Sequence, residues 1–256
     1  MKPAVKALTF DLWDTIFIDD SDEPKRAAQG LRPKSEQRPY AIFEALKDQE
    51  GITWEKVFFA HKLTTSAFNK VWHDQHVTWT VRDRLEVLFT GLGVTLPGDR
   101  LQKLILELED METVIRPDPI PGAFEALSEL KKHYRLAVIS DAIYSPGRAL
   151  RELLNGINLL DIFEVFIFSD EMGFSKPDPR VFTTAAEKLG VPIENMIHIG
   201  DRDHNDVKGP QQLGARAVLF TATRDRDKNM TTADAICERY ADLPGIIARL
   251  DGARSS

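Results

Sequence analysis

The chain of 256 residues is 43% hydrophobic and 29% charged, and its formal net charge is −7. These values predict a globular protein with one large domain or a core plus a smaller one. They argue against a nucleic-acid-binding protein, which usually presents a basic surface. A single cysteine, Cys237, excludes a disulfide within one chain and a zinc site built from thiolates.

The first predicted element is a buried strand at residues 5–10, where Val5, Ala7, Leu8 and Phe10 form an apolar run. Asp11 follows directly, so its carboxylate stands at the carboxyl end of the strand. In an open parallel sheet, the ligand crevice lies outside these ends. Because Asp11 also interrupts the run, the stretch is too short for a signal peptide or a membrane span. We therefore expect a cytoplasmic protein with no membrane association.

A polar segment and then a helical block follow the first strand. Residues 19–39 are rich in Pro, Asp, Lys and Arg and are predicted to be a linker and loop. One of their arginines, Arg26, Arg32 and Arg38, could reach a substrate anion, but we interpret each as solvated surface charge. Residues 40–113 carry apolar side chains at helical spacing, punctuated by Gly and Pro, which predicts a bundle of about four helices.

After Gly122, the pattern changes to alternating helices and strands. The predicted helices are residues 123–132, 146–154, 180–189 and 206–213, and the predicted strands are residues 136–139, 165–168, 196–199 and 217–220. This alternation indicates right-handed crossovers and a parallel sheet. We expect an α/β fold with a doubly wound, Rossmann-like core at residues 1–18 and 118–256. The helical block, residues 19–117, is then a cap inserted after the first strand.

Polar residues with complementary chemistry follow four of the predicted strands: Asp11, Ser140, Lys176 and the pair Asp201 and Asp206. A carboxylate nucleophile can attack phosphorus to give an aspartyl-phosphate, provided that the charge of the phosphoryl group is neutralised. A metal ion, an ammonium group and a hydroxyl donor would neutralise it. Crowded carboxylates offer only oxygen ligands, which favours Mg²⁺.

Four ordered segments, FDLWDT, VISD, GFSKPDP and IGDRDHND, together with the cap position, resemble the haloacid dehalogenase (HAD) superfamily of hydrolases. Most members are Mg²⁺-dependent phosphatases. The resemblance implies that Asp11 is the nucleophile and a metal ligand, and that Ser140 and Lys176 hold the phosphoryl group. It further implies metal binding by the backbone carbonyl of Trp13 and by Asp201, with Asp206 beside the metal or acting through water.

The first motif departs from that of the phosphatases in this family. Their second aspartate, which protonates the leaving oxygen and later activates water, is replaced here by Trp13. Dehalogenases of the superfamily also carry an aromatic residue there, but they need no metal and usually have neutral residues in place of Asp201. Asp141 is a smaller departure, because the family often has Asn at this position. Candidates for the missing proton donor are Asp14, Asp203, His204 and a histidine of the cap.

We expect a Mg²⁺-dependent hydrolase, namely a phosphatase of a small phosphorylated metabolite that acts through an aspartyl-phosphate on Asp11. One alternative is a metal-free 2-haloacid dehalogenase, favoured by Trp13 and opposed by Asp201, whose charge would repel a carboxylate substrate. Another is a catalytically weak member that binds a phosphorylated metabolite or a protein partner. Loss of general acid–base help costs about 10²–10⁴-fold in rate, so Trp13 alone does not exclude an active enzyme.

Overall fold

A six-stranded parallel sheet forms the centre of the computed structural model, which describes residues 4–252. The strand order is β3-β2-β1-β4-β5-β6. β1 (Ala7–Phe10) pairs with β2 (Arg135–Ser140) on one side and with β4 (Met196–Gly200) on the other. The remaining strands are β3 (Val165–Phe168), β5 (Arg216–Phe220) and β6 (Ala235–Cys237). The chain reverses its direction of winding between β1 and β4, where open α/β sheets bind ligands.

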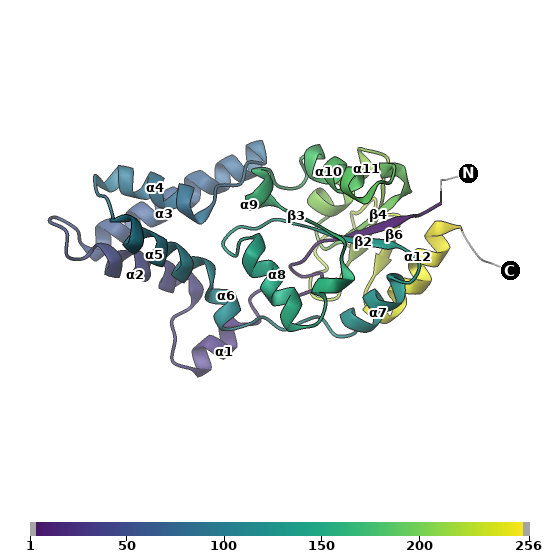
Figure 1. Cartoon of the computed structure of the whole chain (residues 1–256), viewed down its shortest axis with the longest axis horizontal. Helices are drawn as coiled ribbons and strands as arrows, with labels where there is room; N and C mark the ends of the chain where they lie inside the picture. Colours follow the sequence, from purple (N-terminus) through teal and green to yellow (C-terminus); the bar gives the residue numbers. More distant parts are fainter. Residues whose placement is uncertain (1–3, 253–256) are drawn as a thin grey trace.

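Helices cover both faces of the sheet (Figure 1). One face packs against α7 (Ala123–Leu130), α8 (Gly147–Gly156) and α12 (Leu243–Asp251). The other face packs against α10 (Pro179–Leu189). Because both faces are covered, the strands are apolar on both sides; all four residues of β1 are buried. The predicted doubly wound α/β core is confirmed.

Two C-terminal elements and one turn differ from the sequence-based prediction. β6 and α12 were not predicted. The helix expected at residues 206–213 begins instead as a π-helical turn, Asp203–Lys208, and continues as the short α11 (Gly209–Gln211). The wider turn has a physical basis, because the Asp206 carboxylate folds back to accept the backbone N–H of Arg202 (2.9 Å). Such turns are frequent at functional sites.

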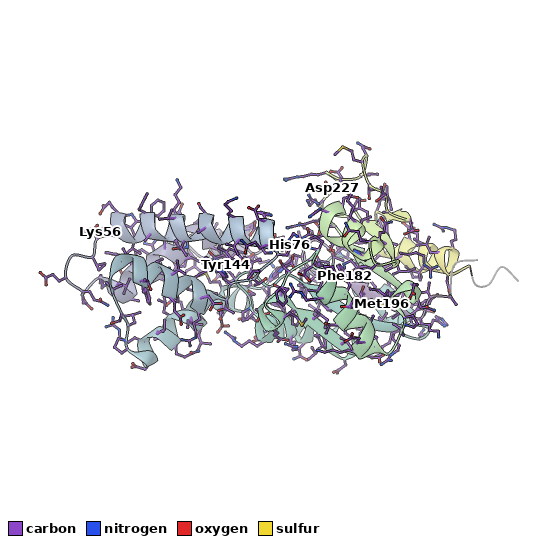
Figure 2. All side chains as sticks on the ribbon, turned by 90° about the horizontal axis from the view of Figure 1, so that it is seen from above. Lys56, His76, Tyr144, Phe182, Met196 and Asp227 are labelled. Carbon is purple, nitrogen blue, oxygen red and sulfur yellow. The ribbon has the colours of Figure 1, made fainter. Side chains whose placement is uncertain are left out.

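The insertion between β1 and β2 is helical, as expected, and lies beyond one edge of the core (Figures 1 and 2). Its main helices are α2 (Lys34–Leu46), α3 (Trp54–Gln75), α4 (Val81–Leu92) and α5 (Gly98–Glu109), followed by the short α6 (Met111–Val114). They pack around an apolar core of their own. Figure 2 shows His76 and Tyr144 where these helices meet the sheet domain.

The prediction of a linker and loop at residues 19–39 is wrong. This segment holds α1 (Glu23–Ala28) and the start of α2. Buried ion pairs order it: Lys34 Nζ lies 2.7 Å from Asp22 and 3.0 Å from Glu112. Arg26 is also buried rather than solvated, and its guanidinium donates to the carbonyl of Arg32.

We propose the domain division expected from the sequence, with a cap at residues 19–117 between two parts of the core, 1–18 and 118–256. Residues 1–3 and 253–256 of that core lie outside the described part of the chain. Over residues 4–252, no helix combines the length and the hydrophobicity needed to cross a bilayer.

Candidate active site

Three carboxylates meet at the carboxyl edge of the sheet. Asp11 follows β1, Asp201 follows β4, and Asp206 lies in the π-helical turn. All three side chains are buried, and one oxygen of each lies within 4.8 Å of the others. Adjacent parallel strands bring the first two together, because Phe10 and Ile199 are in register.

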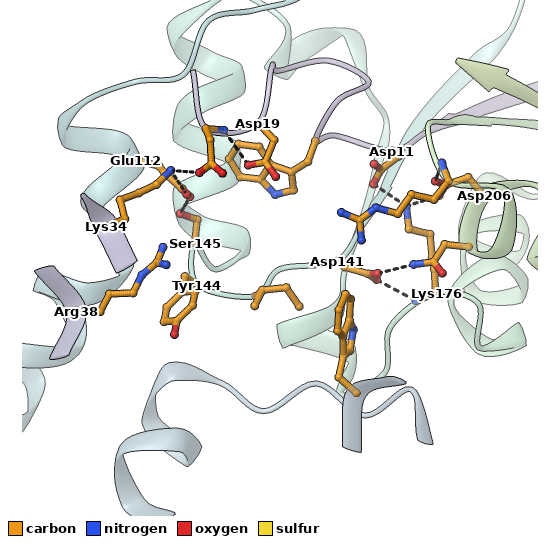
Figure 3. A pocket seen from close by; sticks show the side chains of 16 residues that line it. Asp11, Asp19, Lys34, Arg38, Glu112, Asp141, Tyr144, Ser145, Lys176 and Asp206 are labelled. Carbon is orange, nitrogen blue, oxygen red and sulfur yellow. Dashed lines mark hydrogen bonds and ion pairs between the residues drawn. The ribbon is translucent and has the colours of Figure 1, made fainter. Parts of the chain in front are cut away.

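Lys176 provides a buried positive charge to this cluster (Figure 3). Its Nζ lies 2.6 Å from both Asp11 Oδ1 and Asp206 Oδ1. It is carried by the loop between α9 (Ser169–Met172) and α10. Burial alone would lower the pKa of Lys176, but Asp11, Asp206 and Asp141 outweigh it and raise that pKa. The lysine is therefore permanently charged.

The three carboxyl groups differ in their affinity for protons. Burial and the charges of Asp206 and Asp11 raise the pKa of Asp201 to about 8. Burial likewise raises the pKa of Asp11. Burial would do the same for Asp206, but Lys176 and His198 outweigh it and lower that pKa. Arg224 and Arg202 approach the Asp201 carboxylate only at 3.5 and 3.8 Å, and the pKa of Asp201 stays raised in their presence. A cation bound at the cluster would therefore compete with protons.

A hydrogen-bonded chain beneath the sheet edge orients Asp206. His198 of β4 is fully buried, and its Nε2 lies 3.1 Å from Asp206 Oδ1. Burial lowers the pKa of His198, so the neutral ring donates from Nε2 and accepts the Thr9 hydroxyl proton at Nδ1 (2.8 Å). Gly200 completes the support, because any Cβ at this position would overlap the Asp206 carboxyl group. Thr9 and His198 were missed from the sequence, although a histidine within an otherwise apolar strand (Met196–Gly200) is a signal that could have identified this contact.

A cavity of about 270 Å³ lies between the cluster and the cap. Asp11, Lys176 and Asp206 line one end, and Lys34, Arg38 and Tyr144 line the other (Figure 3). The interpretation of Arg38 as solvated surface charge is therefore wrong. Its guanidinium stacks 3.5 Å from the Tyr144 ring centroid, and its buried Nε finds no hydrogen-bond partner in the described part of the chain.

The residues of the first and second motifs have distinct surroundings. Trp13 lines the cavity and packs against Phe17, with ring centroids 6.3 Å apart. Ser140 is buried at the end of β2, and its hydroxyl has no hydrogen-bond partner among residues 4–252. An unpaired buried hydroxyl is costly and is free to donate to a ligand. Metal binding by the Trp13 carbonyl stays a prediction.

The candidate proton donors named from the sequence do not line this cavity. Asp14 accepts the Thr223 hydroxyl (2.9 Å). Asp203 pairs with Lys208 (2.7 Å). His204 and His76 line a second cavity, with their rings 6.4 Å apart.

The donor set of the cluster fits a hard divalent cation. Asp11, Asp201 and Asp206 offer oxygen ligands alone, which suits Mg²⁺ rather than softer metals that prefer nitrogen or sulfur. The burial of the three carboxylates and the approach of their oxygens to within 4.8 Å of one another support the same conclusion.

Comparisons with known proteins agree with this geometry. Residues 5–214 match the family model described as haloacid dehalogenase-like hydrolase. A protein named glyceraldehyde 3-phosphate phosphatase, from Methanothermobacter thermautotrophicus, is 33% identical over 228 residues, covering 85% of this chain and 86% of the relative.

Two solved structures share the fold over nearly their whole length. A 2-haloacid dehalogenase from Pseudomonas syringae superposes with a TM-score of 0.64 at 22% identity, covering 96% of this chain and 99% of the other. The HAD-hydrolase YfnB from Bacillus subtilis, described as bound to magnesium, gives a TM-score of 0.55 at 21% identity, with 95% and 99% covered. At these identities the likeness establishes the fold alone.

Proposed function

Because the chain belongs to the haloacid dehalogenase-like hydrolases, we propose that it is a Mg²⁺-dependent phosphatase of a small phosphorylated metabolite. The observation that carries this proposal is the buried cluster of Asp11, Asp201 and Asp206 with Lys176 between two of them. The relative named glyceraldehyde 3-phosphate phosphatase supports a phosphorylated metabolite of small size. A cavity of about 270 Å³ suits such a substrate.

Each residue of the cluster has a role in the proposed reaction. The Asp11 carboxylate attacks phosphorus and becomes the aspartyl-phosphate. Lys176 and the unpaired hydroxyl of Ser140 hold the phosphoryl oxygens. Asp11, Asp201 and Asp206 would hold Mg²⁺, which would supply further positive charge to the phosphoryl group beside Lys176. Cap residues line the cavity opposite the cluster, where they would limit the access of water.

Dehalogenation is the second candidate, because Trp13 lines the cavity where phosphatases of the family carry an acid. The cluster of buried carboxylates argues against dehalogenation. A 2-haloacid brings its own carboxylate, which Asp201 and Asp206 would repel in a buried site.

The two reactions are separated by measuring both products from the same preparation. Metal-stripped protein is incubated with and without Mg²⁺, and phosphate release from small phosphate monoesters is compared with halide release from 2-haloacids. The proposal expects Mg²⁺-dependent phosphate release and no halide release. Halide release that persists in a chelator would establish the dehalogenase instead.

A further inference from the structure

A phosphatase acting on alkyl phosphates needs a proton for the departing oxygen, because an alkoxide is a poor leaving group. The Trp13 side chain carries no acid. Asp14 accepts the Thr223 hydroxyl and Asp203 pairs with Lys208, while His204 and the histidines of the cap line cavities other than that of the nucleophile. A proton donor must come within hydrogen-bond reach of the leaving oxygen, so the search narrows to the acidic side chains that line this cavity.

Six acidic residues line the cavity: Asp11, Asp19, Asp20, Glu112, Asp141 and Asp206. Four of them are held by lysines. Lys176 binds Asp11 and Asp206, while Lys34 binds Glu112 at 3.0 Å and Asp20 at 3.2 Å. Within residues 4–252, Asp19 and Asp141 are the members of this set for which the structure gives no ion pair.

The two remaining carboxyl groups, those of Asp19 and Asp141, differ in the charged residues around them. The charges that act most strongly on Asp19 are those of Asp20, Asp14, Glu112 and Lys34, and neither Asp11 nor Lys176 is among them. Asp141, by contrast, faces Lys176, Asp11, Asp206 and Arg202. Figure 3 shows Asp141 beside Lys176 and Asp19 nearer the cap end. Only Asp141 therefore stands next to the position where phosphorus is attacked.

Local contacts hold the Asp141 carboxyl group in place. Its Oδ1 accepts the backbone N–H of Lys176 at 2.9 Å, and its Oδ2 lies 3.4 Å from Asn205 Nδ2. It follows Ser140 directly, so it leaves the sheet edge beside the hydroxyl that would contact the phosphoryl group. Burial raises the pKa of Asp141 to about 7, which keeps a substantial fraction protonated near neutral pH.

We propose that Asp141 is the general acid and base of this enzyme and replaces the aspartate lost at Trp13. The inference rests on the proposed phosphatase function. As Asp11 Oδ attacks phosphorus, the bond to the leaving oxygen breaks, and that oxygen takes the Asp141 proton to give the alcohol. The Asp141 carboxylate then accepts a proton from water as the water oxygen attacks the aspartyl-phosphate. The bond from phosphorus to Asp11 breaks, which releases phosphate and restores both side chains.

The test compares Asp141→Asn with Asp19→Asn, a matched change in the same cavity. Asn keeps an oxygen that accepts the Lys176 N–H, so a purely positional role of Asp141 would survive the substitution. Rates are measured with p-nitrophenyl phosphate, whose leaving group departs without a proton, and with glycerol 3-phosphate, whose leaving group needs one. Circular dichroism checks that each variant is folded.

We expect Asp141→Asn to lose about 10²–10⁴-fold in kcat with glycerol 3-phosphate and less than tenfold with p-nitrophenyl phosphate. Asp19→Asn should change both rates by a similar factor. Equal losses with the two substrates in Asp141→Asn, or no loss in either, would overturn the inference.

The wild-type protein provides a second measurement that does not depend on a folded variant. With an acid in place, its rate should depend only weakly on the pKa of the leaving group across aryl and alkyl phosphates. A steep decline toward alkyl phosphates would overturn the role of Asp141 while leaving the phosphatase function intact. Absence of phosphate release from every ester would instead refute the proposed function itself.

Discussion

Over residues 4–252 the protein has two buried lysines, Lys176 and Lys34. Comparing them tests whether Lys176 and the metal ion neutralise the same carboxylates, with Lys34 as the matched control. Lys176 and Lys34 have side chains that are 3% and 4% exposed. Lys176 Nζ lies within 3.0 Å of the buried carboxylates of Asp11 and Asp206. Lys34 Nζ lies within 3.0 Å of the buried carboxylates of Asp22 and Glu112. Only the carboxylates of Lys176 belong to the candidate metal site.

Substitution of either lysine by methionine keeps the length of the side chain and removes its charge. Leaving buried carboxylates without their cation costs about 3–5 kcal/mol of unfolding free energy, so both variants should be destabilised to a similar extent without metal. Mg²⁺ at ten times its dissociation constant stabilises a folded protein by about 1.4 kcal/mol. The unfolding free energy of Lys34→Met should rise by this amount when Mg²⁺ is added, as should that of the wild type.

Lys176→Met should gain more from Mg²⁺, because the ion then replaces the missing charge. We expect at least tenfold tighter Mg²⁺ binding, which at the same Mg²⁺ concentration adds about 1.3 kcal/mol to the increment. Urea unfolding with and without Mg²⁺ measures the difference, and urea avoids the screening that guanidinium would cause. Equal Mg²⁺ increments in the two variants would refute the idea that Lys176 and the metal act on the same carboxylates.

Three further predictions address the nucleophile and the metal site. Asp11→Asn should abolish phosphate release while leaving the circular dichroism spectrum unchanged; retained turnover would exclude an aspartyl-phosphate on this residue. Because a proton on Asp201, whose pKa is about 8, must leave before Mg²⁺ binds, Mg²⁺ affinity should be roughly tenfold lower at pH 7 than at pH 9. Calorimetry checks this, and an Asp201→Ala variant that still binds Mg²⁺ with the same pH dependence would contradict it. Gly200→Ala should weaken Mg²⁺ binding at least tenfold, because the new Cβ displaces the Asp206 carboxyl group. Gly91→Ala, where the space is open, should leave Mg²⁺ affinity intact and stabilise α4 by about 0.5–1 kcal/mol; equal effects of the two substitutions would count against the close approach at Gly200.

The parts of the fold with strong local patterns were predictable. The strand at residues 165–168 has the predicted bounds, and the other predicted strands differ by one or two residues at their ends. β6 has only three residues, too few for a period to be recognised. The π-helical turn also escaped prediction, because it depends on the contact between Asp206 and the backbone of Arg202.

The sequence by itself determined the family, the α/β core with an inserted helical cap, and the approach of Asp11, Asp201 and Asp206 to one another. It could do so because buried parallel strands all end at the same edge, so residues that follow them must meet there. Only the tertiary structure decided that residues 19–39 are ordered, since Lys34 and Glu112 are far apart in the chain and pair only after folding. It also decided which acids face the nucleophile. Asp14 and Asp141 both follow sheet strands closely, yet one turns toward Thr223 and the other toward Lys176. Such orientations arise from contacts between distant segments, which no local pattern of residues encodes.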